Sequence, residues 1–129
     1  MSMKLIYVVS PYAGDIEKNT EFAKKACRHT MEQGHVFFCP HLMYPNILDD
    51  NKPEERNHAI NMGLEVLKKC DELWCYGEKI SHGMHLEIQE AKKQGISIRR
   101  IIEQDSSFII GNVKNSMQLQ TSELSIQMA

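Results

Sequence analysis

The stretch that decides the fold is Leu5-Ile6-Tyr7-Val8-Val9-Ser10-Pro11-Tyr12-Ala13-Gly14-Asp15. Its first five residues are apolar and partly β-branched, which predicts a strand covered on both faces, as in a parallel sheet. Turn residues follow, and an apolar stripe from Ile16 to Met31 at helical spacing predicts a helix that ends near Gly34. A second apolar run at 35–39 completes a β-α-β unit.

The rest of the chain continues this alternation. Helices are predicted from Pro53 to about Lys69 and from the cap residue Ser81 to about Gly95, and strands over 72–76 and 96–101. The alternation predicts an α/β fold, a flavodoxin- or Rossmann-like doubly wound parallel sheet of four to five strands with helices on both faces. In the first of these helices, the apolar positions expected to face inward are Ala59, Ile60, Leu64 and Leu67.

Two segments depart from this pattern. A loop of 13 residues, 40–52, separates the second strand from the next helix, and loops of that length are usually functional or mobile. From residue 103 the sequence is rich in Ser, Gln and Asn, apart from Phe108-Ile109-Ile110, which could form a fifth strand. Residues 116–128 could form a short helix or a disordered tail. We therefore expect one domain over 1–102 and a C-terminal extension over 103–129 that is partly ordered or mediates oligomerisation.

Composition describes an ordinary globular protein. Of 129 residues, 42% are hydrophobic and 25% charged, which excludes disordered and collagen-like classes. The net charge of -2 gives no electrostatic footprint for a nucleic acid polymer or an anionic membrane. No apolar run approaches the roughly 18 residues of a membrane span, and the first residues lack signal-peptide architecture. We expect a cytoplasmic protein that binds a small molecule.

The four cysteines fit a reducing compartment. They form no CxxC pair, so neither a zinc ribbon nor a redox pair is indicated. We expect free, buried thiols at Cys27, Cys39, Cys70 and Cys75.

Three turns of the predicted sheet should meet at one edge. They follow the first three strands and cover residues 10–15, 40–53 and 77–87. Ligands of open parallel sheets bind beyond the carboxyl ends of the strands. Polar residues of these turns are therefore expected to converge on one site, although they are far apart in the sequence.

The turn richest in chemistry is Ile80-Ser81-His82-Gly83-Met84-His85-Leu86-Glu87. Ser81 and Gly83 offer a hydroxyl and backbone N–H groups at a helix N-terminus, which suits an anion. Glu87, one to two turns further on, could serve as nucleophile or base, or could be a solvated helix residue that suits the helix dipole. His82 and His85 are three residues apart, but a metal site needs more ligands, and we expect surface histidines and no metal.

The sequence motifs of several other enzyme and cofactor-binding classes are absent from this chain. The turn at 10–15 has no GxGxxG fingerprint, although it could present backbone amides and the Tyr12 ring to a nucleotide; alternatively it is a plain turn with Asp15 as helix cap. Neither GxxxxGK[ST] nor GxSxG occurs in the chain. Phosphate-loop NTPase and serine hydrolase chemistry are therefore not indicated.

Taken together, these motifs resemble the nucleoside 2-deoxyribosyltransferase-like superfamily. The resemblance is strongest to a small domain of unknown function that is common in phage and bacterial genomes, and it covers about residues 4–101. It rests on three segments: Ile6-Tyr7 with the turn at 10–15, Leu64-Glu65-Val66-Leu67 running into Cys70-Asp71, and Ser81-x-Gly83-x-x-x-Glu87 with Ala91 and Gly95.

The resemblance implies a mechanism and roles for named residues. Glu87 would attack the anomeric carbon of a deoxynucleoside or its 5′-phosphate, and water or an acceptor base would then take the sugar, as in a retaining glycosidase. Tyr7 would orient Glu87, and His41 would lie near the base. Contacts to sugar or phosphate oxygens would come from Ser10, Pro11, Tyr12, Gly14, Ser81, Gly83 and Met84. No cofactor is implied.

One position departs from the family. Its members usually carry an aspartate, eight residues before the position of Asp71, that helps protonate the departing base; here that position is Gly63. General acid catalysis is commonly worth about 10²–10⁴-fold. Asp49, Asp50 or His41 from the long loop could replace the aspartate, or the domain has kept the pocket and lost the reaction.

Three classes of function therefore stay open. The first is an N-glycosidase or 2-deoxyribosyltransferase acting on nucleosides or nucleotides. The alternative is a non-catalytic module that senses or sequesters a nucleotide or an ADP-ribose-like molecule, and the third is a structural subunit. Because a unit of this size offers a shallow cleft, and family members close theirs with a neighbouring subunit, we also expect a homo-oligomer with Phe108-Ile109-Ile110 as its contact.

Overall fold

The computed structural model describes residues 2–111 of the chain. It contains one five-stranded sheet with strand order β2-β1-β3-β4-β5, in which β5 alone runs antiparallel to its neighbour. The strands are β1 (Leu5–Val9), β2 (Val36–Phe38), β3 (Glu72–Tyr76), β4 (Ser97–Gln104) and β5 (Ser107–Gly111). The helices are α1 (Ile16–Glu32), α2 (Pro40–Met43), α3 (Pro53–Leu67) and α4 (His82–Gln94), with a 3₁₀ turn η1 (Tyr44–Asn46).

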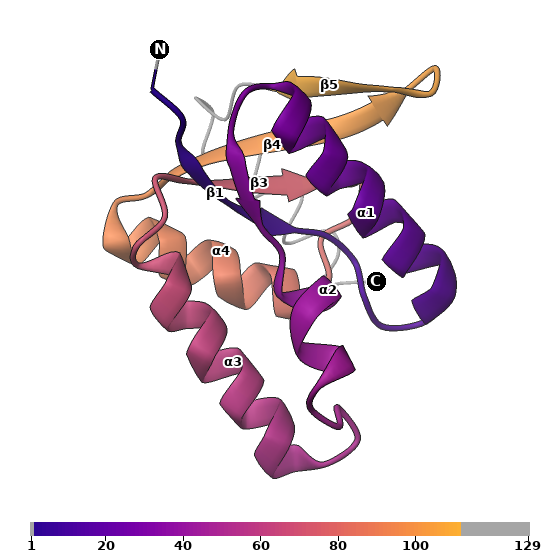
Figure 1. Cartoon of the computed structure of the whole chain (residues 1–129), viewed down its shortest axis with the longest axis vertical. Helices are drawn as coiled ribbons and strands as arrows, with labels where there is room; N and C mark the ends of the chain where they lie inside the picture. Colours follow the sequence, from indigo (N-terminus) through magenta and orange to yellow (C-terminus); the bar gives the residue numbers. More distant parts are fainter. Residues whose placement is uncertain (1, 112–129) are drawn as a thin grey trace.

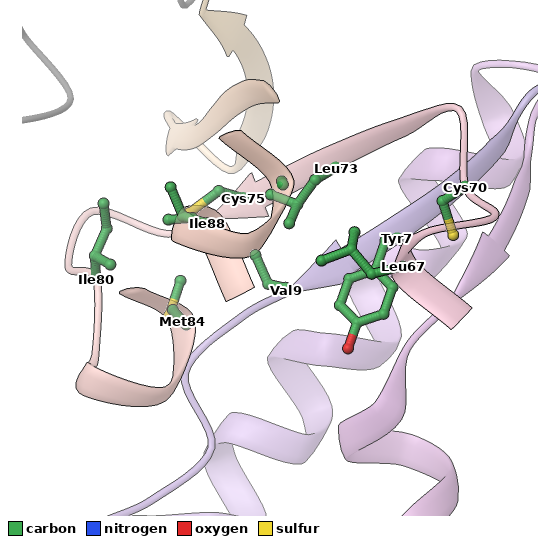
Figure 2. Packing of buried hydrophobic residues seen from close by; sticks show 10 residues of the cluster. Tyr7, Val9, Leu67, Cys70, Leu73, Cys75, Ile80, Met84 and Ile88 are labelled. Carbon is green, nitrogen blue, oxygen red and sulfur yellow. The ribbon is translucent and has the colours of Figure 1, made fainter. Parts of the chain in front are cut away.

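Helices cover both faces of the sheet, which confirms the predicted α/β class (Figure 1). Successive side chains of a strand point to opposite faces. On β1, Ile6 and Val8 therefore pack with α1, whereas Tyr7 and Val9 pack with α3 and α4. The second of these cores is drawn in Figure 2, where the Tyr7 ring lies beside Leu67 and its hydroxyl points away from the other labelled side chains.

The long loop contains more regular structure than the sequence predicted. Residues 40–46 form α2 and η1, and each of these short helices has a proline at its start, where the fixed φ of proline suits the first helical positions. Helix α3 begins at Pro53, as expected, with Glu54 and Glu55 in its first turn. The chain therefore folds back over the carboxyl end of β1 before α3 begins (Figure 1).

The sheet continues past residue 102, since β4 ends at Gln104 and β5 pairs with it. The two strands are joined at Asp105 and Ser106, whose φ angles of 51° and 63° are those of a tight hairpin turn. Phe108 and Ile110 pack against the core on the α1 side, and Ile109 is exposed. The helix or tail considered for 116–128 lies outside the described residues.

The four cysteines are free and buried, as predicted. Within residues 2–111, the structure contains no helix long and apolar enough to cross a membrane. Within the same range, no group of three His, Cys, Asp or Glu side chains is placed to hold a metal ion.

Candidate active site

A cavity of about 150 Å³ lies at the carboxyl end of β1. It is bounded by β1 and the turn after it, by the α2–η1 loop, by one side of α3 and by the first turns of α4. The lining residues are Tyr7, Tyr12, Pro40, His41, Tyr44, Pro45, Leu48, Asp50, Glu55, Arg56, Ala59, Ile60, Leu64, Gly83, Leu86 and Glu87. All three turns expected to converge contribute to this list.

The centre of the site is a hydrogen-bonded pair, Tyr7 and Glu87. The Tyr7 hydroxyl donates to Glu87 Oε2 over 2.6 Å. Burial raises the pKa of the Tyr7 phenol, and the charge and hydrogen bond of Glu87 raise it further, so Tyr7 keeps its proton. Burial also raises the pKa of Glu87 to about 7, although the hydrogen bond from Tyr7 acts in the opposite direction. Glu87 is thus a carboxyl group close to half ionised at neutral pH, with one oxygen held by Tyr7.

Helix α4 brings Glu87 to the cavity from a well-defined N-terminus. Ser81 is the N-cap: its Oγ accepts a hydrogen bond from the Met84 backbone N–H over 3.3 Å. The Ser81 N–H in turn donates to Met84 Sδ over 3.4 Å, and the Met84 side chain is buried in the core. Neither Ser81 nor Met84 lines the cavity, whereas Gly83 does.

An aromatic pair forms part of the cavity wall. The rings of Tyr12 and His41 stack with their centroids 5.0 Å apart and their planes 22° from parallel. Burial lowers the pKa of His41, against smaller raising effects from the charge of Asp50 and a hydrogen bond with the Ser10 backbone. His41 is consequently a neutral ring at pH 7, and its N–H is engaged by Ser10.

The two aspartates of the long loop occupy different places. Asp50 lines the cavity. Asp49 does not: its Oδ1 accepts from the Asn51 N–H over 2.9 Å, and its own N–H donates to Glu55 Oε1 over 3.1 Å. Asp49 therefore shapes the loop and ties it to the start of α3.

The remaining residues predicted in the first turn lie behind or beside the cavity. Ser10 is fully buried, and its hydroxyl has no hydrogen-bond partner among the described residues. Pro11 is half-buried, and Gly14 is exposed with a φ of +98°. None of the three lines the cavity, so this turn reaches it through Tyr12.

The contribution of α3 was missed as a site and interpreted as core. Glu55, Arg56, Ala59, Ile60 and Leu64 recur at helical spacing and line the cavity. Leu67 alone of the four positions expected to face inward is fully buried, and Ile60 is exposed. Only the C-terminal part of α3 packs on the sheet, because its first half stands across the cavity from β1. The sequence signal that could have identified this cavity wall is a helical stripe that begins with charged residues and ends with leucines.

Residues 4–101 match a family described as Domain of unknown function (DUF7768). The chain belongs to this family. No curated protein matches it. Among solved structures, this DUF7768 chain is similar to a 2-deoxyribosyltransferase from the psychrotolerant bacterium Bacillus psychrosaccharolyticus, with a TM-score of 0.61 and 20% identity over 92% of this chain and 81% of that one. It is also similar to a 2-desoxiribosyltransferase from Leishmania mexicana, with a TM-score of 0.52 and 16% identity over 78% of this chain and 65% of that one. At these identities the likeness shows the fold.

Gly63 of this DUF7768 chain lies directly against the Tyr7 hydroxyl. A Cβ atom at this position would sit 2.8 Å from Tyr7 Oη, closer than real contacts allow. Gly63 is buried within α3. The space that a side chain at position 63 would need is therefore taken up by the Tyr7 hydroxyl.

Proposed function

We propose that this protein is an N-glycosidase or 2-deoxyribosyltransferase that acts on nucleosides or their 5′-monophosphates, with Glu87 as nucleophile. The observation that carries the proposal is the Tyr7–Glu87 hydrogen bond at the wall of a cavity. The Tyr7 hydroxyl, which makes no other hydrogen bond among the described residues, holds one carboxylate oxygen and leaves the second free to react. The similarity of the fold to two 2-deoxyribosyltransferases supports the same chemistry.

The proposed reaction has two steps. Ionised Glu87 attacks the anomeric carbon with Oε1, the oxygen not held by Tyr7, and the C1′–N bond breaks. The resulting glycosyl ester is then attacked by water in a hydrolase or by an acceptor base in a transferase, which regenerates the carboxylate. Tyr7 acts as a positioning group in both steps, because its proton stays on the phenol while the Glu87 oxygen gains and loses negative charge.

Around this pair, the stacked rings of Tyr12 and His41 offer a surface for a base, and the backbone at Gly83 offers donors to sugar oxygens. Asp50 is the acid of the long loop that reaches the cavity. Ser81 and Met84 support the reaction by fixing the start of α4, while Ser10, Pro11 and Gly14 shape the turn that carries Tyr12.

The test is base release from a panel of nucleosides, 2′-deoxynucleosides, their monophosphates and NAD, followed by chromatography. Glu87→Gln should abolish release while keeping the fold. Glu90→Gln is the matched control, since Glu90 lies on the same helix, outside the cavity, and accepts a hydrogen bond from Gln94. Full activity of Glu87→Gln would refute the mechanism.

Gly63 favours the second candidate, a non-catalytic module for a nucleotide or an ADP-ribose-like molecule. A binding protein needs no proton donor at that position, and the cavity can hold a ligand without turning it over. Thermal stabilisation by a panel member, with no base released from any, would support this function and exclude the first.

We further propose that the protein assembles as a homo-oligomer through its extension, residues 103–129, and works in the cytoplasm of a bacterium or in a phage-infected cell. The exposed side chains of Ile102 and Ile109 support an interface at β4 and β5, where they are paired in register. Four buried free cysteines support a reducing compartment. A strictly monomeric species at micromolar concentration would contradict the assembly.

A further inference from the structure

The charged side chains and the possible proton donors of the cavity decide which nucleosides it can cleave. Its lining holds three carboxyl side chains, Asp50, Glu55 and Glu87, against one cation, Arg56. Lys52 lies beside Glu55, with 3.7 Å between Lys52 Nζ and Glu55 Oε2, but its side chain is largely exposed. Acidic groups therefore still outnumber basic ones around the cavity. This balance disfavours an added negative charge on the ligand and favours a positive one.

The tyrosines and the histidine that line the cavity are poorly suited to protonate a departing base. Burial raises the pKa of Tyr7, Tyr12 and Tyr44, which makes all three poor acids near neutral pH. The Tyr7 hydroxyl already donates to Glu87. His41 is neutral, and its N–H bonds the Ser10 backbone. Gly63, against Tyr7, leaves no room for an acid side chain at that point of the wall.

Four aromatic rings, Tyr7, Tyr12, His41 and Tyr44, line the cavity that Glu87 also lines. The rings of Tyr12 and His41 stack with their centroids 5.0 Å apart. Faces of aromatic rings attract cations, an effect of about 0.5–2 kcal/mol that grows with desolvation. A flat cationic ring placed here would gain both this attraction and that of the surrounding carboxylates.

We propose that the cavity selects N-glycosides whose base carries a positive charge, such as N-alkylated purines or pyridinium rings. This inference rests on the proposed function. When the C1′–N bond breaks, its electron pair passes to the ring nitrogen system and cancels the positive charge, so the base departs neutral and needs no proton. Glu87 Oε1 forms the new bond to C1′. Water then attacks C1′, the carboxylate is released, and the proton of the water passes to solvent.

The experiment uses matched substrates that differ by one methyl group: 7-methylguanosine against guanosine, and 7-methyl-2′-deoxyguanosine against 2′-deoxyguanosine. We measure kcat/KM for base release at pH 6, where the methylated guanine ring keeps its N1 proton and therefore its positive charge, with the full chain, and subtract the rates without enzyme. A missing general acid is worth about 10²–10⁴-fold, so a preference for the methylated base of at least 100-fold is expected. Asp50→Asn should reduce that preference about 10-fold, whereas Glu54→Gln, on an exposed residue outside the cavity, should not.

The outcomes separate the two proposals. Guanosine or 2′-deoxyguanosine cleaved within about 10-fold of its methylated partner would overturn the selectivity and leave the proposed function intact. A preference that Asp50→Asn does not change would overturn the electrostatic basis of the selection. Base release from neither pair, nor from any other member of the nucleoside panel, would overturn both.

Discussion

The contact between Gly63 and Tyr7 gives a prediction about stability that does not depend on the proposed function. In an exposed or uncrowded helix, replacing Gly by Ala stabilises the protein by about 1 kcal/mol. In α3 the new methyl group would lie 2.8 Å from Tyr7 Oη, so the oxygen would have to retreat by about 0.6 Å to reach the ordinary contact distance of 3.4 Å. The Tyr7 side chain is fully buried, and its hydroxyl is held by Glu87 at 2.6 Å. Both the packing around the Tyr7 ring and the hydrogen bond to Glu87 therefore oppose this movement of the oxygen.

The expected magnitude follows from these terms. Overpacking a filled core costs about 1–3 kcal/mol, and weakening a hydrogen bond to an ionisable partner adds to that cost. Gly63→Ala should therefore lower the free energy of unfolding by about 1–2 kcal/mol despite the gain in helix propensity. In a Tyr7→Phe background the colliding oxygen is absent, so the same substitution should raise stability by about 1 kcal/mol. The coupling between the two positions should reach about 2–3 kcal/mol.

The assay is urea unfolding of the four proteins of this cycle, followed by far-ultraviolet circular dichroism, with equal m-values as the check that the unfolded states are comparable. Gly83→Ala serves as a control, because a Cβ there meets nothing within 4 Å. Gly83→Ala should not lower the free energy of unfolding. If Gly63→Ala stabilises both backgrounds equally, the assigned contact between α3 and Tyr7 is incorrect.

Further predictions concern charge and backbone conformation. The pKa of Glu87 is raised to about 7 from 4.5, so its neutral form is favoured by folding; the stability advantage of wild type over Glu87→Gln should fall by roughly 3 kcal/mol between pH 4.5 and 7, measured by urea unfolding. Burial would raise the pKa of Glu72, but hydrogen bonds from Lys4, Trp74 and Arg99 lower it to about 2. Glu72→Gln should therefore cost about 2 kcal/mol at pH 7, and a loss that persists unchanged at pH 2 would argue against the charged network. Ser106→Gly should raise the free energy of unfolding by about 1 kcal/mol, because Ser106 has a φ of 63°, which costs energy for any residue except glycine. A drop in the thermal midpoint would contradict this.

The strands and long helices could be predicted because their signals are local. The run Leu5–Val9 became β1 with the expected bounds, and Ser81 and Gly95 are the caps of α4. Each of these signals depends on the side-chain period of a strand or on the unpaired backbone groups at a helix end, which neighbouring residues decide.

The candidate site could be predicted only in part. Chain topology places the ends of parallel strands at one edge, and that rule predicts that the turns carrying His41 and Glu87 lie together. Tyr7 was predicted only through the family resemblance. It could not separate Asp50, which lines the cavity, from Asp49, which caps its own loop. Adjacent residues with the same chemistry differ here because the loop's hydrogen bonds turn one inward and the other along the chain.

The sequence by itself determined the parallel strands, the three long helices and the position of Glu87 near the start of the last of them, since periodicity and caps act within about one helical turn. The tertiary structure alone decided that α3 walls a cavity with Glu55, Arg56 and Ile60, that Tyr12 stacks on His41, and that Gly63 faces the Tyr7 hydroxyl. The contacts of Tyr12 with His41 and of Tyr7 with Gly63 join residues that are 29 or more positions apart. The cavity depends on how far α3 stands from the sheet. Such distances depend on the volume of every side chain packed between the elements, and no local pattern carries that information.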